Sequence, residues 1–550
     1  SQQLEPIRNA DLHPLGVTLS NGEFTLSVTD ATISGRGQDL IFTRTYRSQS
    51  HESGWLGPNW SVALLNEKVI DEPFCDPDGL RWYQSDGSWR RYPSPSSVGE
   101  VVQGPVGRVR DDGAIEIRTP DGTVRRFGER HNGYYEGTLH LTRVTRPGAM
   151  PIELEWEPSM YPKGRPYIPV AMRLYSCDDH EATNPLGADV CDPVEVARVE
   201  FEVEEFCEYG WKCTLYGPVS RLASAMVIDK RGNEEKRRRL EFSYTFDGDS
   251  QYQDGFLDTV RIVELVPDGE GGWEEGTSQL VADYDYEGIR DSAKGDNVIM
   301  VKDGGSEPIL DLSYQYDEES PLERDVVQTI ETEATRWEDA AITRFSYTPH
   351  PNPDPENDLW PHIQKTTIER ETPNGTRISE HTYDKHGHLK SVERPDGSLL
   401  TYEYDEDGRL TDATWPSGRS QHWRYAERWG VRLESPVKFW EEPPEGEAHD
   451  AELQMTCYAV EPLSGQVWRT RSPNGIDPAE VGDPEAFTCS FEDGDTLRAH
   501  VSQTVLGWMK AGSASADGHL DEYLTRWEIS PDSDDPLFRG EAGEPAQWPW

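Results

Sequence analysis

The chemistry open to this chain of 550 residues is limited first by the catalytic motifs that it lacks. It contains no Gly-x-Ser-x-Gly nucleophile elbow, no Walker phosphate-binding loop and no His-Glu-x-x-His zinc helix. His180-Glu181-Ala182-Thr183-Asn184 begins like the zinc motif, but Asn184 stands where the second histidine is required. We interpret this segment as solvated surface, and we predict no catalytic residue and no cofactor.

Carboxylates are the commonest group with chemical potential, since the chain has 102 Asp and Glu residues. A pair of them serves a glycosidase, but with so many acids the closeness of two is expected by chance. Asp76-Pro77-Asp78-Gly79 and Asp493-Gly494-Asp495 offer the oxygen ligands that Ca²⁺ prefers, yet neither completes an EF-hand loop. We interpret both as hairpin turns and predict no metal site.

Five tryptophans leave a choice between binding and packing: Trp82, Trp89, Trp415, Trp423 and Trp429. Exposed indole rings stack on sugar rings or line a cavity. Aromatic side chains also pack between neighbouring hairpins, where cross-strand pairs stabilise sheets. We favour packing.

The seven cysteines indicate an oxidising compartment, and so a secreted or cell-surface protein. Cys177 and Cys191 bracket one polar loop, and Cys207 and Cys213 bracket a short aromatic one. We predict a disulfide in each pair. The chain has no C-x-x-C pair, which argues against zinc and dithiol redox chemistry. Cys75 is the thiol that we expect to remain unpaired.

The formal net charge of −49 excludes nucleic acid as a partner, because binding a phosphate backbone needs clustered Lys and Arg. Two interpretations of the acidity remain open: a solvated acidic exterior, and an electrostatic role in holding a basic cargo or Ca²⁺. No run of about 18 apolar residues occurs, so we predict no membrane span.

Alternating residues and frequent turns predict an all-β fold. Apolar Phe24, Leu26 and Val28 alternate with polar neighbours, and residues 40–46 form a second strand pattern. Asp-Gly pairs supply hairpin turns throughout the first part of the chain. Further strands are predicted at residues 139–144, 152–156, 199–203, 240–246, 280–286 and 310–316. One short helix is expected at 520–527.

A repeat of 21 residues emerges from residue 373 onward. Tyr383, Tyr404 and Tyr425 are spaced 21 residues apart, and the first two open a Tyr-Asp-x-x-Gly sequence. A second turn recurs in step with them, at Pro373-Asn374-Gly375, Pro395-Asp396-Gly397, Pro416-Ser417-Gly418 and, later, Pro473-Asn474-Gly475. Each unit is therefore two short strands and two turns, which must stack on its neighbours to bury an apolar face.

The unit predicts the roles of its residues: Tyr383, Asp384, Gly387, Tyr404, Asp405, Gly408, Arg409 and Tyr425. Asp405 occupies the first position of a type I turn and Gly408 the fourth. We expect Gly408 at positive φ and Tyr404 largely buried against the adjacent unit.

These residues resemble the YD repeat of Rhs proteins, which toxin-complex shells and teneurins share. The sequence Tyr-Asp-x-x-Gly-Arg-Leu at 404–410 carries this resemblance. The stretches 21–24, 35–37, 42–48 and 56–60 are similar, in order, to the domain that opens many bacterial Rhs proteins. The two matches cover about residues 15–65 and 373–433.

The resemblance implies an all-β strip of YD-repeat hairpins that spirals into a shell or forms an open curved sheet, with an N-terminal β domain. In toxin members the shell encloses a C-terminal effector that autoproteolysis frees. This chain is shorter than such shells, and residues 530–537 echo the self-cleavage motif only faintly. We predict four parts: an N-terminal Rhs-type domain at 1–100, an irregular sheet at 101–340, the YD repeats at 341–500 and a partly helical extension at 501–550.

The function predicted from this resemblance is a non-catalytic shell or scaffold segment of a secreted polymorphic toxin. Its partner is then an enclosed effector or a further segment of the same shell. The alternative is a cell-surface adhesin that binds a glycan or protein receptor through its loops. A third hypothesis is a carbohydrate-active enzyme on a β scaffold.

Overall fold

The computed structural model describes residues between 13 and 489, and they fold as β-strands with helical backbone only at Val481. The all-β prediction is confirmed. Outside the description lie residues 1–12, 36, 51–52, 72–79, 86–88, 93–106, 110–113, 120–122, 129–137, 147–148, 159–166, 178–192, 207–218, 232–234, 246–254, 287–296, 303–307, 316–325, 333–340, 351–362, 373–374, 429–430, 433–434, 445–453, 461–466, 472–480, 482 and 490–550. The helix expected at 520–527 falls among these.

The chain divides into two compact units: unit 1 comprises residues 1–91, 129–178 and 192–400, and unit 2 the remainder. The N-terminal strands of unit 1 are β1 (Val17–Thr18), β2 (Glu23–Ile33), β3 (Leu40–Arg47), β4 (Ser53–Gly54), β5 (Gly57–Pro58), β6 (Trp60–Val62), β7 (Lys68–Asp71) and β8 (Leu80–Tyr83). Its later strands are β13 (Thr138–Thr145), β14 (Ile152–Pro158), β15 (Tyr167–Cys177), β16 (Pro193–Phe206), β17 (Val219–Asp229), β18 (Lys236–Thr245), β19 (Phe256–Pro267), β20 (Trp273–Tyr286), β21 (Val298–Lys302), β22 (Pro308–Gln315), β23 (Val326–Thr332), β24 (Ala341–Pro349), β25 (Ile363–Thr372), β26 (Gly375–Tyr383) and β27 (Leu389–Glu393).

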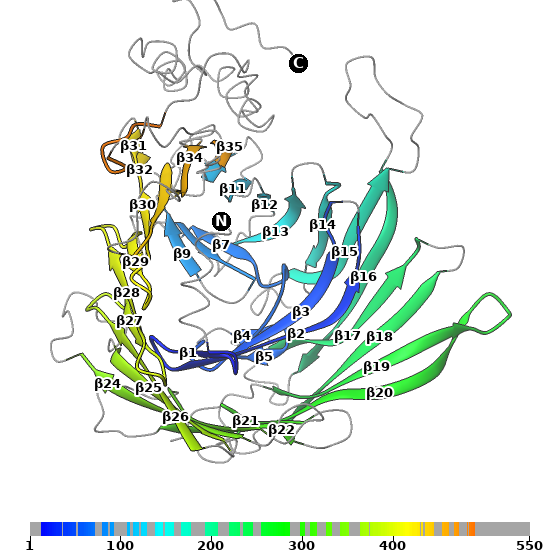
Figure 1. The fold of residues 1–550 in the computed structure, drawn as a ribbon. Helices are drawn as coiled ribbons and strands as arrows, with labels where there is room; N and C mark the ends of the chain where they lie inside the picture. The colour runs from blue at the N-terminus through cyan, green and yellow to red at the C-terminus, as the bar shows by residue number, and fades with distance from the viewer. Residues whose placement is uncertain are drawn as a thin grey trace, which may run out of the picture. The chain divides into compact units, whose positions relative to one another are not determined.

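Strands β13 to β27 of unit 1 form one antiparallel sheet in which neighbours in sequence are neighbours in space. Figure 1 shows β14 to β20 in this order, with the hairpin of β19 and β20 extending beyond its neighbours. Every strand segment predicted between residues 139 and 316 lies at least mostly within one of these strands. The connections are hairpins because antiparallel strands need only a short turn between them.

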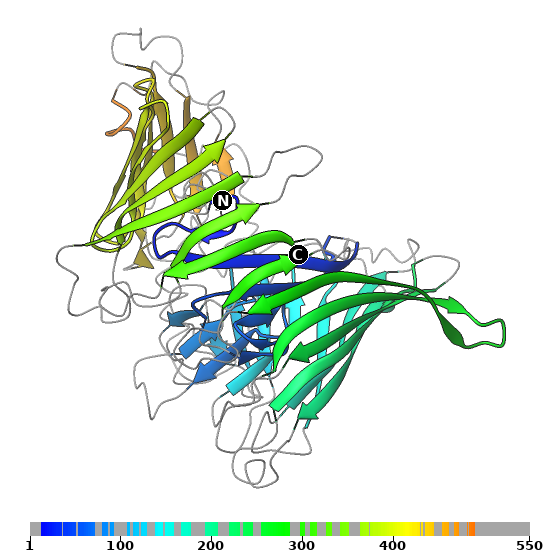
Figure 2. The same ribbon diagram turned by 90° about the horizontal axis from the view of Figure 1, so that it is seen from below.

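Residues 13–66, called here the N-terminal segment, lie against one face of this sheet. Strands β1, β2, β3 and β6 form a small sheet of their own. Figures 1 and 2 both show it in dark blue beside the cyan and green strands. We call the sheet face under this segment the covered face and the opposite face the outer face. The core of unit 1 lies between the two layers, where Phe24, Phe42, Tyr46 and Trp60 are buried.

Unit 2 contains antiparallel strands that are hydrogen-bonded in the order β28-β29-β30-β33-β34-β35. Strands β9 and β28 contain the residues at which the chain passes between the units. The strands are β9 (Trp89–Tyr92), β10 (Gly107–Val109), β11 (Ile115–Arg118), β12 (Val124–Gly128), β28 (Leu399–Tyr404), β29 (Leu410–Thr414), β30 (Ser420–Arg424), β31 (Glu427–Arg428), β32 (Val431–Arg432), β33 (Lys438–Glu442), β34 (Gln454–Val460) and β35 (Val467–Arg471).

Candidate functional site

The tight turn of the repeat is held by its aspartate. Asp405 Oδ1 accepts hydrogen bonds from the backbone N–H of Asp407 at 3.0 Å and of Arg409 at 2.9 Å. The N–H of Gly408 donates to the carbonyl of Asp405 at 3.0 Å, and Gly408 has φ 76° as predicted. Asp and Gly therefore take the first and fourth positions of the turn.

The same turn recurs one 21-residue repeat earlier in the sequence. Asp384 Oδ1 accepts from His386 N and His388 N at 2.8 and 2.9 Å, and Gly387 has φ 84°. Partial burial alone would raise the pKa of Asp384 and Asp405. Hydrogen bonds from the backbone and from the side chain four positions later lower the pKa of both carboxyls overall.

The tyrosines of the repeat differ in burial, and Tyr404 is less buried than Tyr383. Tyr404 is only half-buried, whereas Tyr383 is 3% exposed. Tyr383 ends strand β26, whose His381 faces His13 of the N-terminal segment. Burial of a repeat tyrosine therefore depends on what lies over its strand, which a 21-residue period does not encode.

Successive repeats in unit 2 are linked by Arg409. Its guanidinium lies 4.8 Å from the ring centroid of Tyr425 in the next unit, and its Nε donates to Asp405 Oδ2 at 2.7 Å. Burial raises the pKa of Tyr425 to about 12. Arg409 thus connects the turn of one repeat to the aromatic ring of the next.

A β-bulge precedes the aromatic residue near the end of many strands, and this pattern extends the repeat far beyond the segment where sequence revealed it. In each case the pairing register shifts between the aromatic and the residue before it. One residue of the following strand is left without a partner at this point. These aromatics are Trp156, Tyr175, Tyr244, Tyr286, Tyr314, Tyr383 and Tyr404. A bulge bends its strand and increases the local twist, so its regular recurrence curves the sheet.

Hydrogen bonds connect these aromatics into a ladder across unit 1. Tyr286 OH donates to the carbonyl of Leu257, the residue paired with Tyr244 across the bulge, at 2.7 Å. The relation repeats along the sheet: Tyr314 donates to Val298, the partner of Tyr286, and Tyr347 donates to Val327, the partner of Tyr314, at 2.9 and 2.7 Å. Tyr244 OH likewise donates to Leu222 O, and Trp156 Nε1 to Leu141 O. Each ring satisfies a carbonyl on the strand before it, and all of these rings except Tyr347 lie directly after a bulge.

On the outer face, pairs of side-chain hydroxyls link neighbouring strands at the residue directly before some of these aromatics. Ser243 and Thr259 are hydroxyl partners at 2.6 Å, as are Thr382 and Ser391 at 2.6 Å. Ser313 and Thr329 repeat the pair. Because neighbouring residues of a strand point to opposite faces, the bulges at Tyr244, Tyr314 and Tyr383 carry a hydroxyl pair on one face and an aromatic ring on the other.

Arg44 of the N-terminal segment is the most deeply buried charge in contact with the covered face among the residues described. Its Nε lies 2.7 Å from Asp30 Oδ2, and its Nη1 donates to Tyr284 OH. The side chains of Arg44 and Asp30 are 0% and 3% exposed. Burial alone would lower the pKa of Arg44, but Tyr284 and Asp30 raise it overall. The guanidinium is therefore a paired, permanently charged anchor.

Two further contacts fix the N-terminal segment to the same strands. Trp60 Nε1 donates to Tyr286 OH at 2.9 Å, and Tyr46 OH accepts from Val298 N at 3.1 Å. Tyr286 and Val298 are thus shared between the ladder and the N-terminal segment. The segment is bonded to the repeat at the points where its bulges occur.

The beginning of the segment contacts a later part of the sheet. Thr366 Oγ1 donates to the carbonyl of Leu19 at 2.6 Å, and Val327 N donates to the carbonyl of Gly22 at 3.0 Å. Gly22 has φ +73°, and a Cβ there would lie 2.7 Å from Val326 Cγ1. Only glycine fits this close approach.

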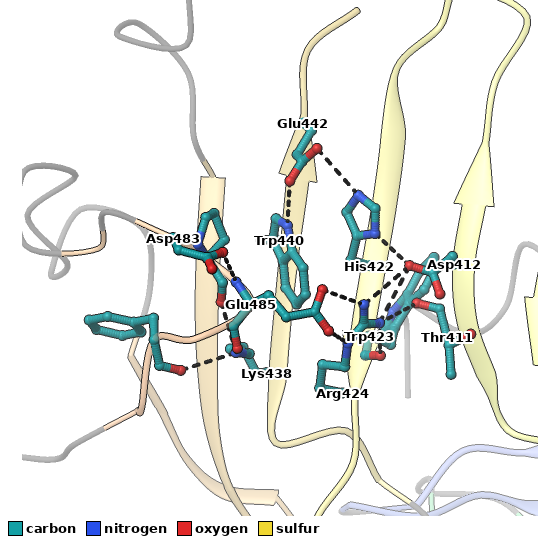
Figure 3. A network of polar contacts seen from close by, with 12 residues as sticks. Thr411, Asp412, His422, Trp423, Arg424, Lys438, Trp440, Glu442, Asp483 and Glu485 are labelled. Atoms are coloured by element: carbon teal, nitrogen blue, oxygen red, sulfur yellow. Dashed lines mark hydrogen bonds and ion pairs between the residues drawn. The ribbon is translucent and has the colours of Figure 1, made fainter. Parts of the chain in front are cut away.

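Unit 2 holds a second cluster, shown in Figure 3. Lys438 Nζ donates to three backbone carbonyls, those of Pro484 at 2.8 Å, Glu485 at 2.7 Å and Phe487 at 3.0 Å. Arg424 binds both carboxylate oxygens of Glu485 at 3.0 and 3.2 Å. Burial is the main cause that lowers the pKa of Lys438, with a further contribution from Arg424.

The same cluster contains a serine, a histidine and an aspartate in the order of a hydrolase triad. Ser420 Oγ lies 3.0 Å from His422 Nε2, and His422 Nδ1 lies 2.6 Å from Asp412 Oδ1. However, the Glu442 carboxylate lies 3.8 Å from the same Nε2 and would repel a developing oxyanion. His422 also stacks on Trp440 at 4.8 Å. We interpret the three residues as a polar ladder between strands.

The two predicted disulfides involve side chains that the structure does not describe. Cys191, Cys207, Cys213 and Cys75 lie outside the described residues, as does the side chain of Cys177. The structure instead contains a disulfide between Cys457 and Cys489, 32 residues apart, with Cα atoms 5.7 Å apart. Sequence reasoning missed it because it looked for pairs that bracket short loops.

Three further predictions concern the packing of tryptophans, metal sites and membrane-spanning helices. Trp82 and Trp423 are each 2% exposed, so these two tryptophans pack in the interior. The described residues contain no group of three or more His, Cys, Asp or Glu side chains placed to hold a metal ion. Within the same residues no helix is long and apolar enough to cross a membrane.

Two family models match the chain. A domain of unknown function (DUF6531) matches residues 16–92, which include the N-terminal segment, and the RHS Repeat matches residues 383–425. The second match contains the turns of Asp384 and Asp405. This match supports the resemblance to the Rhs/YD-repeat family that the sequence predicts.

Solved structures resemble the chain only distantly. The N-terminal domain of effector protein SpvB from Salmonella typhimurium strain LT2 is 11% identical with a TM-score of 0.28, over 43% of this chain and 99% of that one. The crystal structure of TcdB2-TccC3 is 10% identical with a TM-score of 0.31, over 82% of this chain. The Photorhabdus luminescens Tc holotoxin pore is 13% identical with a TM-score of 0.28, over 84% of this chain. The chain spans 33% of the TcdB2-TccC3 chain and 26% of the Tc holotoxin chain. No curated protein matches.

Proposed function

We propose that the chain is a structural shell segment that carries no catalysis of its own. The observation that carries this proposal is the recurring bulge, which is closed on the covered face by the tyrosine ladder and, at three bulges, on the outer face by hydroxyl pairs. A wall built this way gains curvature at regular intervals, while the ring hydroxyls satisfy backbone carbonyls of the preceding strands. The role that we propose for it is mechanical.

The N-terminal segment is the part of the shell that seals the wall of unit 1. It fills the covered face from β14, where Trp55 lies 6.1 Å from Trp156, to β25, where Leu19 accepts from Thr366. Because this face is already occupied, an effector or a further segment of the shell must lie against other surfaces. We also propose that the chain is organised in the four parts predicted from the sequence.

A secreted or cell-surface location is part of the same proposal. The Cys457–Cys489 bond supports it, since such bonds persist in oxidising compartments. The acidic exterior that the net charge of −49 implies is also suited to an exposed shell.

Protection from protease tests the enclosing role. The native reading frame that contains this chain is expressed whole and treated with a protease that cleaves exposed polypeptide. We expect an enclosed segment to survive intact until the shell is unfolded, and then to be digested within minutes. The proposal fails if every part outside the repeat strands is cleaved as fast in the native protein as in urea.

A parallel binding measurement tests the alternative role of the chain in glycan binding. Binding of the intact protein to an array of surface glycans should give no signal above that of a heat-denatured sample. Saturable binding that survives in the protease-treated shell would support the adhesin alternative in place of enclosure.

A further inference from the structure

The chain after strand β35 returns to the sheet of unit 2 as a short strap, defined here as Val481 and residues 483–489. The strap is ordered within itself: Asp483 Oδ1 accepts from Glu485 N at 3.0 Å, and Asp483 O accepts from Phe487 N at 3.0 Å. Figure 3 shows its side chains over strands β30 and β33. The strap lies on the sheet as a compact turn.

Polar contacts hold one end of the strap. The three carbonyl bonds of Lys438 come from a residue that is 7% exposed, so they are shielded from water. The Arg424–Glu485 pair is weaker, because the Glu485 side chain is 65% exposed and its charge is screened. Lys438 is therefore the main non-covalent hold.

The covered surface beneath the strap is apolar. Trp440, Met455 and Cys457 are 2%, 1% and 0% exposed, and Val481, Phe487 and Cys489 of the strap pack against them. Lifting the strap would expose this surface to water, which costs free energy in proportion to the apolar area uncovered.

The disulfide closes the other end of the strap. Cys457 belongs to strand β34 and Cys489 ends the strap, so the bond ties the last described residue of the strap directly to the sheet. A bond that joins residues 32 positions apart removes chain entropy from the open state and so favours the closed one.

We propose that the Cys457–Cys489 disulfide is a reductant-sensitive lock on the strap. A dithiol supplies the two electrons: its thiolate attacks the half-buried Cys489 sulfur and forms a mixed disulfide, with Cys457 leaving as a thiolate that takes up a proton. The second thiol of the reductant then displaces Cys489, which leaves both cysteines as thiols and the reductant as its disulfide. After reduction only non-covalent contacts, those of Lys438 and Arg424 and the apolar packing, hold the strap, so it opens reversibly and uncovers Trp440.

Hydrogen exchange with and without dithiothreitol tests the lock on the whole chain. In the oxidised protein we expect slow exchange across residues 483–489. Reduction should speed it on the order of 100-fold, the scale of the chain-entropy effect of such a bond, while strand β33 keeps its protection. A Cys457→Ser/Cys489→Ser double variant without reductant should behave like the reduced protein, which separates this bond from any other disulfide.

Alkylation gives an independent measure of opening. In the Cys489→Ser variant, Cys457 carries a thiol that iodoacetamide reaches only when the strap lifts. Adding Lys438→Met should speed this reaction by at least about 10-fold, because three charge-assisted hydrogen bonds are lost. A Glu406→Gln change, on an exposed turn of the same unit, should leave the rate unchanged.

Three outcomes would overturn the proposal. The first is equal exchange of the strap in the oxidised and reduced protein. The second is a loss of protection in strand β33 as large as that in the strap, which would mean that the bond stabilises the whole unit. The third is an unchanged rate of Cys457 alkylation in the Lys438→Met variant. None of these results bears on enclosure, so the two proposals fail separately.

Discussion

At the residue scale, Asp405 and Gly408 share the work of one turn. The aspartate satisfies two backbone N–H groups, and the glycine adopts a φ of 76° that a side chain opposes. Gly408→Val should therefore lower the free energy of unfolding by more than about 1 kcal/mol. Urea unfolding followed by tryptophan fluorescence measures it, with Glu406→Val in the same turn as the control that should cost less.

The ladder makes a second prediction at this scale. Tyr347→Phe keeps the half-buried ring but leaves the carbonyl of the fully buried Val327 without the donor that now lies 2.7 Å away. The cost should be about 1–3 kcal/mol, the penalty for a buried acceptor that loses its partner. Tyr425→Phe removes a hydroxyl from a half-buried ring and should cost less. Equal losses in the two variants would contradict a special role for the ladder.

Two histidines predict how stability changes with pH. Burial lowers the pKa of His13 to about 4, with Arg370 adding to the shift, and it lowers the pKa of His381 to about 4, with His13 adding to it. The unfolded chain takes up protons below its ordinary pKa of 6.5, while the folded chain stays neutral until about pH 4. Stability from these groups is therefore full above pH 6.5 and falls as the pH drops toward 4, by up to about 3 kcal/mol for each histidine.

The variant His381→Gln isolates this effect from the many carboxylates. Unfolding free energies of the variant and the parent are compared at several pH values between 6.5 and 5. The parent should lose more stability than the variant over this range. Parallel curves would show that the pKa of His381 is not lowered as described.

At the scale of elements, the N-terminal segment is joined to the sheet by a buried charge. Arg44→Ala would leave Asp30 buried and unpaired, so it should cost about 3–5 kcal/mol, whereas breaking a surface pair costs about 1 kcal/mol or less. The control is Arg143→Ala, whose pair with Glu153 spans 3.9 Å between side chains that are 46% and 42% exposed. Thermal melts of both variants measure the difference, and equal shifts would be evidence against the anchor.

The elements themselves were largely predictable, because alternation and turn chemistry are local properties of sequence. The strands at 139–144 and 152–156 and the glycine turn at 408 follow from such local patterns. The family-level repeat was visible only where tyrosine, aspartate and glycine all remain, from residue 383 onward. Farther upstream the segments between strands are longer and vary in length, so the period is lost while the bulges persist.

What could not be predicted depends on contacts across long stretches of chain. The sequence drew attention to Tyr284 because an aspartate follows it, yet the ring that closes the bulge is Tyr286. Only the register with strand β21 decides between them. The bond between Cys457 and Cys489 and the hold of Lys438 on the strap likewise join residues that no local pattern relates.

At the scale of the whole molecule, charge is the feature that no single contact explains. The chain has 102 acidic and 53 basic residues, so 49 carboxylates remain in excess even if every basic side chain is paired. Many of the ion pairs lie on the outer face, as between Arg173 and Glu155, where each contributes little. The sum of repulsions among the unpaired acids therefore opposes the folded state more than the surface pairs support it.

This balance predicts the sign of the salt effect. Raising NaCl from about 0.02 M to about 0.5 M shortens the screening length from roughly 20 Å to roughly 4 Å, which weakens long-range repulsion more than contact pairs. The melting temperature should rise by several degrees. The bromide salt at equal ionic strength should raise it to a similar extent, since screening depends on charge and not on the identity of the anion. A melting temperature that falls with added salt would mean that the paired charges, and not the excess of 49, dominate the electrostatics of the fold.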